Sequence, residues 1–250
     1  MNSFVLPFCI SLLAGISTLI GTIPIFFKIK QQNVNKFITF CLAFSLSIMI
    51  GISVFDLIPN AFFELTKKYS LLIVMGLFLV SFLINLLLIK LINKKIDTEE
   101  KGSDLYKLGI LNMLVLILHN LPEGIATFLS SYENINLGLK LSFAIMLHNI
   151  PEGLCIAVPI YYATKNRKLA IKYTLMSGLS EPLGAVLSFI FFKQIITPVM
   201  IDIVLIFVAC LMIILSIEKI FPKAKVYNED KYIFFGLIVG IITIVVSLLL

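Results

Sequence analysis

The feature that most constrains the fold is a series of long apolar stretches separated by short polar ones. A helix needs about 20 residues to cross a hydrocarbon core of about 30 Å, and eight stretches reach this length: 4–27, 37–60, 70–92, 108–130, 137–162, 169–192, 198–218 and 232–250. The chain is 60% hydrophobic and only 14% charged, with a mean hydropathy of +1.06, whereas soluble domains are about 25% charged. We therefore predict an all-α integral membrane protein with eight transmembrane helices, forming one domain over residues 1–250.

The distribution of basic residues predicts how these helices are oriented. Lys and Arg concentrate in cytoplasmic loops, and here they gather around the first, third, fifth and seventh connections, with only Lys67, Lys68, Lys140 and Lys193 elsewhere. The odd connections should therefore face the cytoplasm and both termini the outside of the cell membrane. Topology and attraction to anionic inner-leaflet lipid explain the net charge of +6, so no nucleic-acid partner is expected.

Two other features have ordinary structural interpretations. The cysteines, Cys9, Cys41, Cys155 and Cys210, lie on separate apolar stretches without a paired motif, which argues against a disulfide framework or a thiolate metal cluster. We interpret them as small apolar filler, but leave Cys155 open because it follows Glu152 by three residues on the same helical face. The polar segment 93–107 is predicted to be a short solvated cytoplasmic connection.

The only two histidines, His119 and His148, each open the same six-residue phrase. It reads His-Asn-Leu-Pro-Glu-Gly at 119–124 and His-Asn-Ile-Pro-Glu-Gly at 148–153. Both copies start near the middle of predicted helices, where ionisable side chains are costly and indicate function. Because residues four apart share a helix face, His119 should point with Glu123 and His148 with Glu152. The short connection between these helices predicts antiparallel neighbours, so the two phrases should meet near the membrane midplane.

The remaining residues of the phrase favour an irregular, closely packed site. Pro122 and Pro151 lack an N–H and should leave the carbonyls of Leu118 and Leu147 without their usual donor. In a membrane, such carbonyls are tolerated where protein buries them or water reaches them. Gly124 and Gly153 allow a neighbouring helix to approach closely.

Together the two phrases form a candidate metal site, with His119, Asn120, Glu123, His148, Asn149 and Glu152 as ligands. Imidazole nitrogen with carboxylate and amide oxygen suits Zn²⁺, Fe²⁺, Mn²⁺, Co²⁺ and Cd²⁺, whereas the lack of thiolates argues against Cu(I). The set is compatible with one ion or with two bridged by Glu123 and Glu152. A single copy would favour a structural hydrogen bond or a proton relay, but two copies at matching depth favour a metal, since buried charges need partners.

Two further carboxylates lie in apolar stretches. Glu181 is in the middle of the sixth predicted helix and is followed by Pro182, and we predict a functional role for it because packing does not account for a carboxylate at that depth. Asp56 precedes Pro59 near the outer end of the second helix. It is either a ligand on the access side or an interfacial residue, since charges near the interface cost little.

At these residues the chain resembles the ZIP (Zrt-, Irt-like protein) family of metal transporters and, within it, the bacterial ZupT-like branch. The resemblance rests on residues 119–128, 148–153 and 177–181, and extends through the eight-helix layout and the Asp56–Pro59 turn. It implies outside termini, a metal site between the fourth and fifth helices joined by the second and sixth, and usually a homodimer in a bacterial plasma membrane. Family ligands fall on His119, Asn120, Glu123, His148, Asn149, Glu152 and Glu181.

Two departures from the family pattern stand out. The connection between the third and fourth helices lacks the histidines that many members carry there. Three residues before the proline of the seventh helix, where ZupT-like relatives tend to have an acidic residue, this chain has Lys219.

The predicted function is uptake of divalent cations into the cytoplasm, zinc first and then iron, manganese, cobalt or cadmium. The metal is a transported substrate, and we predict neither a cofactor nor catalytic residues. One alternative is an intramembrane zinc metallohydrolase, which requires an open coordination position and a general base; the chain lacks the His-Glu-x-x-His motif of one such class. Another is a metal-gated channel or sensor. The expected partners are metal ions, the lipid bilayer and a second copy of the chain.

Overall fold

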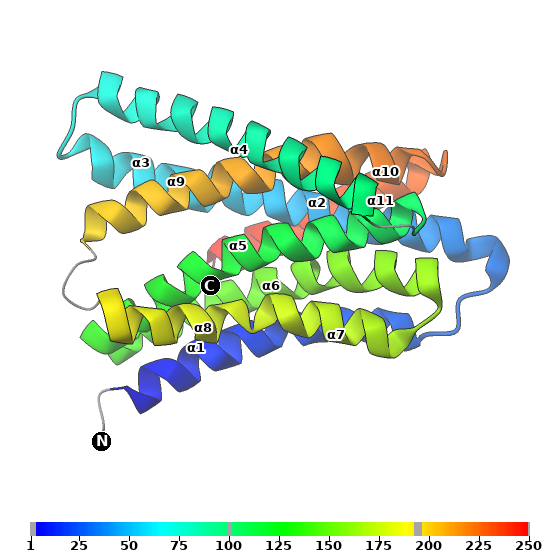
Figure 1. The fold of residues 1–250 in the computed structure, drawn as a ribbon, viewed down its shortest axis with the longest axis horizontal. Helices are drawn as coiled ribbons and strands as arrows, with labels where there is room; N and C mark the ends of the chain where they lie inside the picture. Colours follow the sequence, from blue (N-terminus) through cyan, green and yellow to red (C-terminus); the bar gives the residue numbers. More distant parts are fainter. Residues whose placement is uncertain (1–3, 100–101, 193–196, 250) are drawn as a thin grey trace.

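The computed structural model describes residues 4–99, 102–192 and 197–249, which form a bundle of helices running side by side along its long axis (Figure 1). α1 (Val5–Ser17) continues as a 3₁₀ helix over Thr18–Phe26, and a 3₁₀ turn at Gln31–Asn33 leads into α2. The other α-helices are α2 (Val34–Ile52), α3 (Ile58–Thr66), α4 (Leu71–Glu99), α5 (Asp104–Glu133), α6 (Ile135–Thr164), α7 (Arg167–Gly178), α8 (Ser180–Leu187), α9 (Pro198–Leu215), α10 (Phe221–Lys225) and α11 (Asp230–Leu249).

The predicted all-α membrane architecture is confirmed. Within the described residues, seven helical units are long and apolar enough to cross a membrane, and α11 adds an eighth apolar helix of 20 residues. Several units combine two labelled helices, because α2 continues into α3, α7 into α8 and α9 into α10. The eight units follow the eight predicted stretches in order, and four of them extend beyond the stretch by a turn or more: α2 with α3, α4, α5, and α9 with α10.

The connections at one end of the bundle follow 3₁₀ segment Thr18–Phe26, α4, α6 and α10, and Figure 1 shows them together at its right side. These are the connections around which most basic residues gather. The N-terminus and the turn between α3 and α4 lie at the opposite end. Lys193, one of the four exceptions, lies outside the described residues. The bundle therefore has one lysine-rich end, and its placement toward the cytoplasm stays a prediction.

The polar segment 93–107 is mostly helical, which corrects the prediction of a connection over its whole length. α4 runs to Glu99, and α5 starts at Asp104 after Ser103, whose Oγ accepts a hydrogen bond from the Tyr106 N–H at 3.3 Å. No helix-breaking residue occurs between Asn93 and Glu99, so α4 can extend beyond the apolar stretch into water.

Only Asn134 separates α5 from α6. Its side-chain oxygen accepts hydrogen bonds from the N–H groups of Asn136 at 2.9 Å and Leu137 at 3.2 Å, which caps the start of α6. The two helices pack against each other along their length. The prediction that they are antiparallel neighbours is therefore confirmed, with a connection even shorter than expected.

Prolines interrupt three of the helical units. α7 and α8 meet at Leu179, ahead of Pro182, and π-helical turns at Ser53–Leu57 and Ser216–Ile220 precede Pro59 and Pro222. A widened turn accommodates the missing proline N–H and the bulk of its ring. These two π turns share the spacing Ser-x-x-x-x-x-Pro, and Asp56 and Lys219 occupy the same position in it, three residues after the serine and three before the proline.

α5 and α6 lie at the centre of the bundle, whereas α4 lies at its outside (Figure 1). The main core packs apolar side chains of α2, α5 and α6 together. On α4, large apolar side chains point outward, and Leu72 is 85% exposed. In a membrane protein such a face is covered by lipid. The polar midplane residues of α5 and α6 lie instead inside the bundle, enclosed by the other helices.

Candidate metal centre

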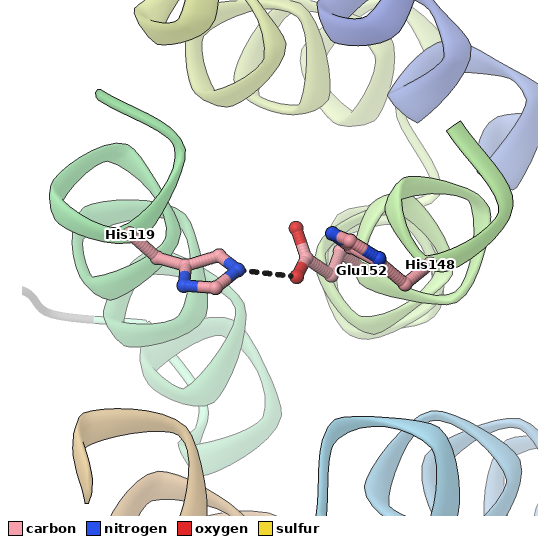
Figure 2. Close-up of side chains that lie close together, drawn as sticks. All are labelled: His119, His148 and Glu152. Atoms are coloured by element: carbon pink, nitrogen blue, oxygen red, sulfur yellow. Dashed lines mark ion pairs between the residues drawn. The ribbon is translucent and has the colours of Figure 1, made fainter. Parts of the chain in front are cut away.

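The two repeated phrases face each other across the boundary between α5 and α6. Figure 2 shows His119 extending from α5 towards His148 and Glu152, which both come from α6. One ligand atom from each of these three residues lies within 4.8 Å of the others. All three side chains are buried, as are Asn120, Glu123, Asn149 and Glu181. The structure thus brings the predicted ligands of both phrases, together with Glu181, into one enclosed region.

Each histidine contacts the glutamate of the other phrase. His119 Nε2 lies 3.0 Å from Glu152 Oε1, and His148 Nε2 lies 3.1 Å from Glu123 Oε1. Within the first phrase, His119 Nε2 is also 3.4 Å from Glu123 Oε1. The expectation that each histidine points with its own glutamate therefore holds for His119, whereas the recorded ion pair of His148 crosses to α5.

The asparagines connect the phrases to neighbouring helices. The Asn149 amide donates to the Ala14 carbonyl of α1 at 2.8 Å and to the Glu181 carboxylate of α8. The Asn120 amide donates to the Ser177 carbonyl of α7 at 3.4 Å. When the nitrogen and oxygen of the Asn120 amide are exchanged, the nitrogen instead donates to Leu116 O at 3.0 Å and Glu152 Oε2 at 3.2 Å. Glu181 thus reaches the site through Asn149, as the third carboxylate of the cluster.

Several polar atoms of this region are buried without a hydrogen-bond partner among the described residues. They include His119 Nδ1 and the Oε2 atoms of Glu123 and Glu181. His119 Nε2 and Glu152 Oε1 lie 3.0 Å apart as an ion pair, but neither forms a hydrogen bond. Leaving such atoms unpaired is costly, and the described Lys and Arg residues form no ion pair with these carboxylates. A divalent cation would satisfy the oxygens and the nitrogens together, so the residues present fit a metal ion.

The distances between the nitrogen and oxygen atoms of the site also match those expected around a bound zinc ion. Zinc binds nitrogen and oxygen at about 2.0–2.2 Å, so two ligands of a tetrahedral ion lie about 3.3 Å apart. The contacts of His119 with Glu152 and Glu123, at 3.0 and 3.4 Å, are close to this value, as is the contact of His148 with Glu123 at 3.1 Å. Little rearrangement of these side chains would be needed to surround an ion.

The glycines that end the phrases bring backbones together around the site. A Cβ on Gly124 would meet the backbone carbonyl of Glu181, and one on Gly153 would meet the carbonyl of Thr18. α5 therefore lies against α8, and α6 against the 3₁₀ segment that follows α1. This close approach places the Glu181 carboxylate beside the two phrases.

One polar link beside the site is absent from the predicted set. Pro159 cannot donate to the carbonyl of Cys155, four residues earlier, and this buried carbonyl instead accepts from the Asn112 amide of α5 at 2.8 Å. The same amide lies 2.8 Å from Cys155 Sγ. The signal was present in the sequence, because the rule applied to Pro122 and Pro151 applies equally to Pro159. Cys155 is thus a packed residue with a polar partner rather than simple filler.

Asp56 lies on one side of the cluster. Its carboxylate accepts a hydrogen bond from Asn60 at 2.6 Å and interacts electrostatically with His148 and Glu123. The side chain is only partly buried, unlike the seven residues of the cluster. The position suits an access-side carboxylate, and its role as a ligand stays a prediction. Lys219, the matching residue of the other π turn, lines a separate cavity at the lysine-rich end together with Glu218, Asp97 and Lys107.

The helical bundle and its buried His and Glu cluster define a multi-pass membrane protein with an enclosed site suited to divalent metal. Comparison with known proteins agrees with this class. The sequence model of one family, described as ZIP Zinc transporter, matches residues 93–248. The chain belongs to this family, whose members are transporters rather than enzymes.

Relatives cover the chain almost completely. Zinc transporter ZupT of Clostridium perfringens is 35% identical, over all of this chain and 97% of the relative. Zinc transporter ZupT of Oceanobacillus iheyensis is 37% identical, over all of the chain and 99% of the relative. The protein of the same name from Streptococcus mutans is 36% identical over 97% and 96%, respectively. The resemblance inferred from the repeated phrases is therefore confirmed.

Proposed function

We propose that the protein carries divalent transition-metal cations, zinc foremost, across the cell membrane into the cytoplasm through the site on α5, α6 and α8. The observation that carries this proposal is the convergence of His119, His148 and Glu152, whose ligand atoms lie within 4.8 Å of one another in a buried region. Relatives named as zinc transporters, similar along their whole length, support the choice of metal.

Charge balance supports a cation as the cargo. Glu123, Glu152 and Glu181 lie together in a region with neutral amides and two imidazoles as neighbours. Ionised carboxylates in such a place need a compensating charge, and a divalent cation supplies it without a change in the fold. Imidazole nitrogen with carboxylate oxygen is a ligand combination that zinc prefers.

We propose that the ion reaches the site from the side of Asp56. Asp56 is partly exposed and interacts with His148 and Glu123, so it can attract a cation and pass it to this pair. A cavity of about 10 Å³ beside His148, between α2, α6 and α11, is near the lower limit for one water molecule. In this pathway the ion exchanges water for His148 and Glu123, and then for His119 and Glu152. Transport requires that binding stay weak enough to release the ion.

The test is zinc flux into vesicles that contain the purified protein. Glu152→Ala should lower the initial rate by about 100-fold or more, because even outer-shell changes at metal sites cost about 10- to 100-fold. Glu133→Ala is the matched control, since Glu133 is an exposed glutamate at the end of α5. Normal zinc flux through the Glu152→Ala variant, with both variants equally inserted, would overturn the proposal.

Two further measurements in the same vesicles address the alternatives. Absence of flux in the unchanged protein, with metal still bound, would favour a sensor. Flux that is insensitive to an imposed pH gradient would favour a channel-like route. Competition of Fe²⁺, Mn²⁺, Co²⁺ and Cd²⁺ against labelled zinc ranks the other proposed substrates, and we expect zinc to compete best.

A further inference from the structure

The largest cavity described lies far from the metal site, at the lysine-rich end of the bundle. It has a volume of about 640 Å³ and lies between the beginning of α2 and the beginning of α11. Its lining includes three basic residues, Lys28, Lys30 and Lys36, and apolar residues that include Phe40, Phe235 and Val239. We call it the α2–α11 cavity. Nothing in the transport pathway proposed above uses it.

The lysines of this cavity are not neutralised by acidic residues. Its lining contains no Asp or Glu, and Lys28, Lys30 and Lys36 form no ion pair within the described part of the chain. Three other lysines at the same end are paired: Lys107 with Asp97 at 3.2 Å, Lys223 with Asp104 at 3.5 Å, and Lys225 with Asp230 at 3.4 Å. The cavity therefore concentrates uncompensated positive charge, which favours an anion.

The shape of the cavity favours an anion that carries an apolar tail. Tyr232 and Val239 both line it, and they are seven residues apart on α11, or about 10 Å at 1.5 Å per residue. Lys28 and Lys30 precede α2 and Lys36 is in its first turn, while Phe235 and Val239, which are 44% and 40% exposed, continue the wall along α11. The cavity thus changes from polar to apolar along α11, in the same order as the headgroup and acyl chains of a phospholipid.

The sequence predicts that this change from polar to apolar lining occurs at the membrane surface. Lys36 on α2 and Lys231 with Tyr232 on α11 are each followed directly by an apolar stretch. Lys36 Nζ lies 5.8 Å from the centre of the Tyr232 ring, so the two helices present one basic and aromatic rim. Basic pockets between transmembrane helices on the cytoplasmic side bind anionic headgroups.

We propose that the α2–α11 cavity binds one anionic phospholipid of the leaflet at the lysine-rich end. Its phosphate is held by Lys28, Lys30 and Lys36, and an acyl chain lies along Phe40, Phe235 and Val239. The lipid would anchor the N-terminal ends of α2 and α11 at the membrane surface. α2 also carries Ser45, whose hydroxyl donates to the Pro151 carbonyl of α6 at 2.7 Å, so the fastened helix is in direct contact with the second metal-site phrase.

The experiment measures binding of labelled phosphatidylglycerol to the detergent-solubilised full chain, with phosphatidylcholine as the uncharged comparison. The Lys28→Gln/Lys30→Gln/Lys36→Gln variant should weaken phosphatidylglycerol binding by about 10- to 100-fold, because each lysine near an anionic surface contributes substantially. The matched control is Lys165→Gln/Lys168→Gln/Lys172→Gln, which removes the same charge at the same end and should change binding by less than about twofold. Equal losses in the two triple variants would overturn the site, because they would show a general charge effect.

A second variant tests the apolar wall without changing charge. Val239→Trp places a larger side chain where the acyl chain should lie, and we expect a loss of about tenfold in phosphatidylglycerol binding, with an unchanged midpoint of thermal unfolding in lipid-free detergent. Unchanged binding by this variant would contradict the proposal. Competition with glycerol phosphate and with inorganic phosphate distinguishes a lipid from a free phosphate as the ligand. If either compound displaces the labelled lipid at equal concentration, the cavity is a site for free phosphate and not for lipid.

Discussion

The two copies of the His-Asn-x-Pro-Glu-Gly phrase are almost identical in sequence but differ in their surroundings. His119 contacts the glutamates of both phrases, at 3.0 and 3.4 Å, whereas His148 contacts Glu123 alone, at 3.1 Å. Asn149 donates to Ala14 of α1 and Glu181 of α8, whereas the Asn120 amide, with its nitrogen towards Leu116 O and Glu152 Oε2, bonds within α5 and α6. A duplicated motif has therefore become an asymmetric site, in which His119 of the first copy contacts both glutamates and Asn149 of the second copy links the site to α1 and α8.

The difference between the histidines gives the largest expected effect. His119→Ala should lower the rate of zinc uptake by about 100-fold and His148→Ala by about tenfold, since His119 contacts two carboxylates and His148 one. Initial rates in vesicles measure both. Equal losses in the two variants would show that the copies act symmetrically and would break the comparison.

The glycines should instead behave alike. Gly124→Ala and Gly153→Ala each place a Cβ against a backbone carbonyl of a neighbouring helix, and we expect each to cost about 1–3 kcal/mol of unfolding free energy through overpacking. Denaturation in detergent micelles measures this loss. Gly76→Ala on α4 is the control, because its Cβ would meet nothing within 4 Å, and it should be neutral or slightly stabilising. A loss in only one phrase would extend the asymmetry to helix packing.

The third prediction concerns the second proline, which only α6 carries. Asn112→Ala should cost about 1–2 kcal/mol, because the buried Cys155 carbonyl loses its donor. Adding Pro159→Ala should recover part of this loss, since the alanine N–H can bond the same carbonyl within the helix. A double-mutant cycle on unfolding free energies measures the coupling. Strictly additive losses would show that Asn112 does not replace the bond lost at Pro159.

Asp56 should give the smallest effect. Asp56→Asn keeps the shape of the side chain and removes the charge, so uptake at low zinc concentration should fall by about threefold, with little change at saturating zinc. Glu64→Gln, an exposed glutamate paired with Lys67 at 2.6 Å, is the control on the same helical unit. A fall in the rate at saturating zinc would instead show that Asp56 is one of the metal ligands.

Most of the fold and the membership of the site were predictable from sequence. Membrane thickness sets helix length, so the apolar stretches marked the eight units. The matching positions of the phrases then predicted that His119, Glu123, His148 and Glu152 converge. The structure brings these residues together with Glu181, which was also predicted and whose approach depends on the close contact of its backbone with Gly124.

The remaining details depend on distances between helices, which local patterns do not carry. The rule that residues four apart share a face pairs His148 with Glu152, yet the recorded contact of His148 is with Glu123 on the other helix. The helical continuation of α4 to Glu99 was hidden because polar composition in a membrane protein resembles a loop. Pro159 indicates in the sequence that the Cys155 carbonyl lacks its usual donor, but only the structure shows that Asn112 of α5 supplies one.

The single residue between α5 and α6 has a consequence for how the chain enters the membrane. Asn134 joins the helices into a hairpin that carries both histidines and two of the glutamates, and their closest contacts run between its two arms. When the hairpin inserts as one unit, these polar groups meet one another before any other helix arrives, which lowers the cost of burying each of them alone. Lengthening this turn would therefore affect biogenesis first, and the yield of inserted protein would report it.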